Sequence, residues 1–190
     1  MLKKPANYDT VQTFGEWQPL ELGGHYLTIL GVKVDKSKSG RDMLVVQYDT
    51  AKNDKQPNYY QDNHEQGRYY QGTHYIVLGD EDWAVRNIKS LITATERSNP
   101  GFQFDWDNPN CLRGKLVGGV FGAEQYLNDR QEVKDSVKLR YFCSNDSVES
   151  ANVPKPKEIA QPKWQAPAAT ASSGDDFAAP SNDTYLPFDL

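Results

Sequence analysis

The sequence has little of what builds disulfide-bonded, metal-binding or membrane-spanning proteins. Of its 190 residues two are cysteine and three are histidine. Cys111 and Cys143 are too few for a disulfide framework and form no CxxC motif, and the histidines lack HExxH spacing. We therefore expect free thiols and no metal or other cofactor. No apolar run approaches the ~20 residues that cross a bilayer, so we also expect a soluble cytoplasmic protein without membrane contact.

The chain has no net positive charge, because its acidic residues outnumber its basic ones. The formal net charge of -5 excludes a surface that is basic all over, so a nucleic-acid site must be a local groove. Hydrophobic residues make up 37% of the chain, below the ~45 to 50% typical of globular domains, which indicates that part of it does not pack. The length suits one domain of ordinary size and a tail.

The stretch from His25 to Thr50 holds two apolar runs joined by a charged loop, which predicts a strand, a loop and a second strand. Leu27 and Ile29 share one face by the two-residue period of a strand, and the phase changes at Gly31. A bulge at Gly31 would bend the first strand and help a sheet to curl into a barrel.

Four cations lie between these two strands or at their ends. They are Lys33, Lys36, Lys38 and Arg41. Only Asp35 and Asp42 dilute them, and small residues leave the loop free to adapt to a partner. The loop is either a binding site for a polyanion or an ordinary solvated hairpin tip, since turns are rich in the same residue types.

The rest of the chain predicts three further strands and one helix. The strands are Thr73 to Leu78, Arg113 to Leu127 and Val137 to Cys143. The helix begins with Asp80 as N-cap and stops at Asn99-Pro100-Gly101. The order is strand, strand, strand, helix, strand, strand. It is the chain order of the OB-fold, a five-stranded Greek-key barrel, so we expect an all-β fold with one helix between strands 3 and 4.

We expect three regions along the chain. Residues 1–24 would form an N-terminal extension that packs on the barrel, and residues 25–146 the OB-fold domain. Residues 147–190 lack periodicity and are rich in Pro, Ala, Ser, Gln and Lys, which predicts a disordered linker. Its end, from Gly174 to Leu190, has four Asp and no Lys or Arg, which is typical of an acidic docking peptide.

Two tyrosine pairs are candidates for base stacking. Tyr59-Tyr60 and Tyr69-Tyr70 lie in polar sequence, the second pair directly after Arg68. An aromatic ring in such surroundings stacks on a base with ~1 to 3 kcal/mol. Adjacent residues of a strand point to opposite faces, so we expect one ring of each pair to belong to the core.

Acidic residues offer an enzymatic alternative. Asp80, Glu81 and Asp82 together with Asp105 and Asp107 would suit the magnesium site of a nuclease, but helix capping already explains the first three. The sequence shows no paired general acid and base and no nucleophile with an orienting partner. We therefore expect no enzymatic activity.

The basic, tyrosine-bearing body, the linker and the terminal Leu186-Pro187-Phe188 resemble single-stranded DNA-binding proteins, in particular those of bacteriophage replication modules. The resemblance implies an OB barrel that coats unpaired DNA in replication and recombination, and a tail tip that recruits partner proteins. A phage-encoded member would act in the host cell cytoplasm. The bacterial members end in Pro-Phe with a free carboxylate, whereas here Asp189 and Leu190 follow Phe188.

This interpretation assigns two sets of residues. The predicted DNA-binding residues are Lys33, Lys36, Lys38, Arg41, Tyr48, Tyr59, Tyr60, Arg68, Tyr69, Tyr70, Lys115, Lys138 and Arg140. The predicted partner-binding residues are Asp183, Leu186, Pro187, Phe188 and Asp189. The alternative function is a protein-binding OB-fold adaptor without nucleic-acid affinity. The number of subunits stays open, a homo-oligomer included.

Overall fold

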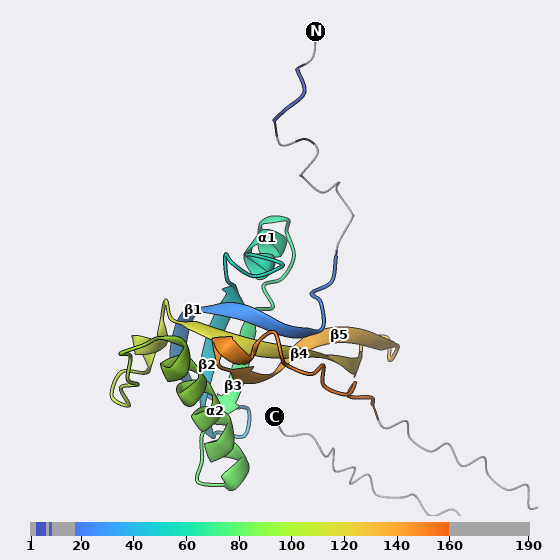
Figure 1. The fold of residues 1–190 in the computed structure, drawn as a ribbon. Helices are drawn as coiled ribbons and strands as arrows, with labels where there is room; N and C mark the ends of the chain where they lie inside the picture. The colour runs from blue at the N-terminus through green and yellow to red at the C-terminus, as the bar shows by residue number, and fades with distance from the viewer. Residues whose placement is uncertain (1–2, 7, 9–17, 160–190) are drawn as a thin grey trace, which may run out of the picture.

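The structure is a computed structural model, and it describes residues 3–6, 8 and 18–159. This part of the chain forms a five-stranded antiparallel sheet with two α-helices and two short 3-10 helices (Figure 1). The strands are β1 (Gly23–Lys36), β2 (Asp42–Thr50), β3 (Thr73–Val77), β4 (Leu116–Leu127) and β5 (Val133–Cys143). The helices are α1 (Tyr59–Glu65), α2 (Asp82–Ser98), η1 (Pro109–Leu112) and η2 (Asn145–Ser147). Neither α-helix is long and apolar enough to cross a membrane.

The strands lie in the order β3-β2-β1-β4-β5, and every neighbouring pair is antiparallel. No backbone ladder joins β3 to β5 in the described part of the chain, so the sheet is open. The ring of His74 on β3 nevertheless meets the ring of Phe142 on β5 edge to face, with 5.5 Å between the centroids. The sheet therefore curls until its two edge strands touch through side chains.

The predicted bulge in β1 is present. The pairing of β1 with β2 shifts register between Ile29 and Gly31, which leaves Leu30 as the extra residue. Up to Thr28 the strand also pairs with β4, whereas beyond the bulge it pairs with β2 alone. The bulge is thus the place where β1 leaves one neighbour, and the far half of the strand is free to line a surface feature.

Helix α2 packs on the core with the face that the sequence predicts. Ala84, Leu91, Ala94 and Thr95 are buried at helical spacing. The predicted N-cap is wrong, because the helix begins at Asp82 after an extended Glu81 that makes no side-chain cap. The Glu81 carboxylate instead pairs with Arg41 at 3.1 Å, so a tertiary contact takes the side chain that would cap the helix.

The expectation of a single helix is also wrong. Helix α1 lies in the polar stretch after β2, at the end of the sheet away from α2 (Figure 1). With seven residues it is too short to show a period in the sequence. The buried Asp49 of β2 stabilises it, because its carboxylate accepts hydrogen bonds from the backbone N–H groups of Tyr60 and Gln61, both at 2.9 Å.

The described residues before β1 contact the body of the protein. Leu20 is buried in the core cluster. His25 Nε2 donates to the Glu21 carbonyl oxygen at 3.0 Å, and its Nδ1 lies 2.9 Å from the buried Asp54 carboxylate. Residues 18–22 are therefore joined to β1 and to the loop that follows β2.

The predicted linker begins too early. Val148 is 5% exposed and lies against Gly118 of β4 and Gly24 of β1. Lys157 pairs with β4 through its backbone, donating to Ala123 O at 3.0 Å and accepting from Gln125 N at 2.9 Å.

The prediction of disorder is thus wrong for residues 147–159. We call these residues the strap, and they are drawn in orange in Figure 1. The pairing of β1 with β4 begins at Gly23 and Phe121, so the later residues of β4 have a free edge to which the strap bonds. These partners are distant in sequence, and no local sequence pattern predicts them. The rest of the predicted tail, residues 160–190, lies outside the described residues.

Candidate nucleic-acid interface

A groove of about 620 Å³ crosses the outer face of β1, β2 and β3. Six of the residues that line it are Lys33, Met43, Val45, Tyr75, Asn110 and Arg113. The neighbours of these residues on β2 and β3, among them Leu44, Val46 and Ile76, are buried on the opposite face. The groove therefore lies on the side of the sheet that the core does not occupy.

Register places a cation, an apolar side chain and an aromatic ring in one row across the groove. Lys33 of β1 is opposite Val45 of β2, and Val45 is opposite Tyr75 of β3. Cross-strand neighbours of this kind have Cβ atoms ~5 Å apart. Tyr75 is 59% exposed and Val45 only 9%, so the ring stands beside an apolar floor. We call this set the Lys33–Val45–Tyr75 row.

The sequence prediction missed Tyr75, although a signal for it was present. Residues 73–78 were predicted as a strand, and in a strand Tyr75 must face away from Ile76. Base stacking was predicted for the two Tyr-Tyr pairs instead, because they lie in more polar sequence.

The far wall of the groove comes from η1 and the residue after it. The pairing of β1 with the β4 segment ends where Ile29 N–H donates to Lys115 O at 2.9 Å. Further along β1, the backbone bonds to a side chain instead of a neighbouring strand: the Val32 N–H donates to Asn110 Oδ1 at 3.3 Å. Arg113, predicted to begin a strand, instead follows η1 directly and lines the groove.

Three of the four predicted hairpin cations are paired with carboxylates. The pairs are Lys33 with Asp35 at 2.7 Å, Lys36 with Asp42 at 2.8 Å and Arg41 with Glu81 at 3.1 Å. The hydrogen bond with Asp35 raises the pKa of Lys33. Lys38 is exposed on the β1–β2 loop without an ion pair to any residue that the structure describes. Exposed pairs of this kind contribute ~0 to 1 kcal/mol, so a polyanion can compete with them.

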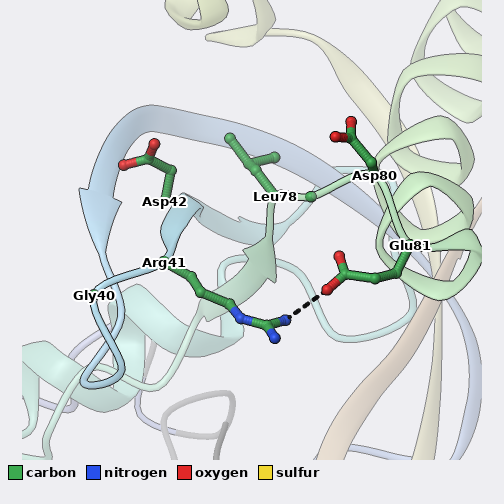
Figure 2. A pocket seen from close by; sticks show the side chains of 7 residues that line it. Gly40, Arg41, Asp42, Leu78, Asp80 and Glu81 are labelled. Atoms are coloured by element: carbon green, nitrogen blue, oxygen red, sulfur yellow. Dashed lines mark ion pairs between the residues drawn. The ribbon is translucent and has the colours of Figure 1, made fainter.

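A second hollow, of about 580 Å³, separates the β1–β2 loop from the turn before α2. Figure 2 shows Arg41 reaching across it to Glu81, with Asp42 and Asp80 on either side. Three carboxylates against one guanidinium make this hollow unfavourable for phosphate. Among residues 3–6, 8 and 18–159 no group of three or more His, Cys, Asp and Glu side chains is placed to hold a metal ion, which includes the acidic set considered for a nuclease.

Two of the predicted stacking tyrosines are core residues. Tyr48 is 2% and Tyr60 6% exposed, and their rings meet edge to face with 5.6 Å between centroids. Burial raises the pKa of both hydroxyl groups. The prediction that Tyr48 and Tyr60 stack on bases is therefore wrong, because the alternation of β2 and the packing of α1 turn both rings inward.

The other predicted tyrosines differ in exposure. Tyr70 is partly buried, and its hydroxyl donates to the Tyr48 carbonyl oxygen at 2.6 Å. Tyr59 also packs partly against the core, whereas Tyr69 is 86% exposed on the loop before β3, next to the exposed Arg68. Of the first pair Tyr60 belongs to the core, as expected, whereas of the second pair Tyr70 is only partly buried against it. Neither pair lies in a strand, so the alternation that the expectation assumed does not apply.

The remaining predicted cations do not line the groove. Lys115 lies over the Phe102 ring, 4.6 Å from its centroid. Lys138 and Arg140 are on β5, at the edge of the sheet opposite β3. Arg140 Nη2 donates to Ala123 O at 2.7 Å, so this side chain supports β4 where the strap joins it. The predicted partner-binding residues of the tail lie outside the described residues.

No protein-family model matches the chain, and no curated protein sequence matches it either. The resemblance to single-stranded DNA-binding proteins thus remains an expectation from the sequence. The functional assignment depends on the chemistry of the groove.

Proposed function

We propose that the chain binds single-stranded DNA in the groove across β1, β2 and β3. The observation that carries this proposal is the Lys33–Val45–Tyr75 row, which sets an exposed ring and a cation on either side of an apolar floor. A base stacks on Tyr75 above Val45 while the adjoining phosphate lies toward Lys33. Such stacking contributes ~1 to 3 kcal/mol per base and tolerates any sequence.

The width of the groove favours a single strand over a duplex. Neighbouring strands are ~4.8 Å apart, so β1 and β3 are separated by roughly 10 Å across β2. That span accommodates one polynucleotide chain. Bases in a duplex are stacked on one another and leave no free face for Tyr75, so duplex binds weakly.

The path of the chain supports an OB barrel as the finer description of the fold. In that fold strand 1 pairs with strands 2 and 4, and a helix follows strand 3. Here β1 pairs with β2 and β4, and α2 follows β3. The contact of His74 with Phe142 places β3 and β5 on the two sides of one seam. The second and third strands of OB barrels commonly carry the oligonucleotide, which is where this groove lies.

In this proposal the protein has no catalytic role. It coats unpaired DNA during replication and recombination, in the phage context that the resemblance of its sequence implies. The acidic tip that contains Asp183, Leu186, Pro187, Phe188 and Asp189 recruits partner proteins.

The test is fluorescence anisotropy of the full chain with labelled oligo-dT and with a duplex of equal length, over a series of salt concentrations. We expect tight binding of oligo-dT and weak binding of duplex. The logarithm of the affinity for oligo-dT should fall with the logarithm of salt by about 0.7 for each phosphate contact. Equal affinity for both probes, or no binding of oligo-dT at low salt, would overturn the proposal.

A peptide-binding adaptor is the second candidate. It is favoured by β3, which is an edge strand of the sheet beside the groove in the part of the chain that the structure describes. Extended peptides add to such edges through backbone hydrogen bonds. The adaptor hypothesis predicts no anisotropy change with oligo-dT, and chemical-shift changes along Thr73–Val77 when an extended peptide is added.

A further inference from the structure

The two cations that line the groove differ in how they are held. Lys33 is paired with Asp35 at 2.7 Å. Arg113 is exposed and makes no ion pair with any residue in the described ranges. A phosphate that binds Lys33 lies beside the Asp35 carboxylate, which already offsets the charge of the ammonium and repels the phosphate, whereas one that binds Arg113 meets no such partner among the described residues. The guanidinium also offers a planar pair of donors that matches two phosphate oxygens.

Asn110 is held beside Arg113 in a defined orientation. Its Oδ1 accepts from the Val32 N–H at 3.3 Å, so its Nδ2 donors are the part of the side chain left to bind a ligand. The Arg113 N–H donates to the Asn110 carbonyl oxygen at 3.0 Å, so both residues belong to one tight turn. Gly114 then returns the chain to β1, with a positive φ of 77° and a bond from its N–H to Ile29 O at 2.7 Å.

We propose that Arg113 and Asn110 form a phosphodiester-binding wall, and that this wall supplies the main ionic contact with the single strand whose bases stack on Tyr75. This inference rests on the proposed function and deepens it. The hairpin cations Lys33, Lys36 and Arg41 contribute less, because the carboxylate paired with each of them already offsets its charge and repels a phosphate.

The first test compares Arg113→Gln with Lys89→Gln. Both variants lose one positive charge, but Lys89 is an exposed residue of α2 that does not line the groove. In salt titrations with oligo-dT we expect Arg113→Gln to bind more weakly and to lower the salt slope by about 0.7, and Lys89→Gln to keep the wild-type slope. An unchanged slope in Arg113→Gln, or an equal decrease in both variants, would overturn the inference.

The second test is Asn110→Asp. The aspartate retains an acceptor for the Val32 N–H, and it places a carboxylate beside Arg113, as Asp35 lies beside Lys33. We expect the thermal midpoint of wild type, weaker binding of oligo-dT and a lower salt slope. Wild-type binding by Asn110→Asp would count against the wall. Failure of the wild-type chain to bind oligo-dT would instead refute the proposed function, so the two failures are distinguishable.

Discussion

Tyr75 lies in the groove because of the two-residue period of β3. Its neighbours His74 and Ile76 point to the inner side of the sheet, where Ile76 is 1% exposed, so the tyrosine must point outward. No other residue of the Lys33–Val45–Tyr75 row offers a face to a base. The proposed function therefore depends most directly on the ring of Tyr75.

We expect Tyr75→Ala to weaken binding of oligo-dT by ~1 to 3 kcal/mol, which is about 5- to 150-fold in the dissociation constant. Tyr75→Phe keeps the stacking face and should bind like wild type. Tyr141→Ala is the matched control, since Tyr141 is 44% exposed but belongs to β5. Anisotropy titrations at one salt concentration measure all three. Equal losses in Tyr75→Ala and Tyr141→Ala would contradict a stacking role at Tyr75.

His74 makes the stability of the seam between β3 and β5 dependent on pH. Burial lowers its pKa from 6.5 to about 4. Between these values the unfolded chain binds a proton that the native protein does not. Above pH 6.5 His74 is neutral in both states and the native protein keeps its full stability. As the pH falls toward 4, the unfolded chain takes up the proton and the free energy of unfolding decreases by up to about 3 kcal/mol.

Urea unfolding of wild type and His74→Leu between pH 7 and pH 4 measures this effect. The difference in the free energy of unfolding between the two proteins should change in favour of His74→Leu as the pH falls. The other ionisable groups are common to both proteins and cancel in the comparison. A constant difference across this range would show that His74 titrates normally in the native protein.

At the scale of elements, local pattern and tertiary contact decided different parts of the fold. The alternation of β1, its bulge at Gly31 and the apolar face of α2 depend on residues close in sequence, and all three were predicted. Helix α1 was missed because its first turn is held by Asp49 from another element. The start of α2 was misplaced because Glu81 bonds to Arg41 across the second hollow (Figure 2).

The candidate site was predicted in part for the same reason. Lys33 lies in the groove as one of the predicted cations, since its place on a hairpin follows from local sequence. Arg113 and Asn110 reach the groove only because β4 stops pairing with β1 at the bulge and η1 takes its place. The contact of Asn110 with Val32 joins residues about 80 positions apart, and no spacing in the sequence predicts it.

At the scale of the whole molecule, the strap moves the end of the folded body beyond the predicted boundary. Val148 packs on glycines of β1 and β4, and Lys157 continues the ladder on the edge of β4. A chain that ends at Asp146 should therefore be less stable than one that ends at Ile159. Burial of Val148 alone is worth ~1.5 to 3 kcal/mol.

Thermal and urea unfolding of the two truncated chains check this prediction. Both should still bind oligo-dT where they remain folded, because the strap lies against Gly23, Gly118 and Gly122, outside the residues that line the groove. A third chain that ends at Ile159 but carries Val148→Ala separates the contribution of this side chain from that of the backbone pairing. Equal midpoints for the chains ending at Asp146 and Ile159 would place the boundary where the sequence predicted it.

The sequence by itself determined the strands, their order along the chain and the bulge, because hydrophobic alternation and glycine act over neighbouring residues. It also determined that positive charge had to be local, since the net charge is -5. Only the tertiary structure decided which rings are exposed and which cations are free of carboxylates. Tyr48 and Tyr75 are both strand tyrosines in apolar stretches. Alternation sets each ring opposite its neighbours in the strand, but which face of the sheet the core covers depends on how the whole sheet closes.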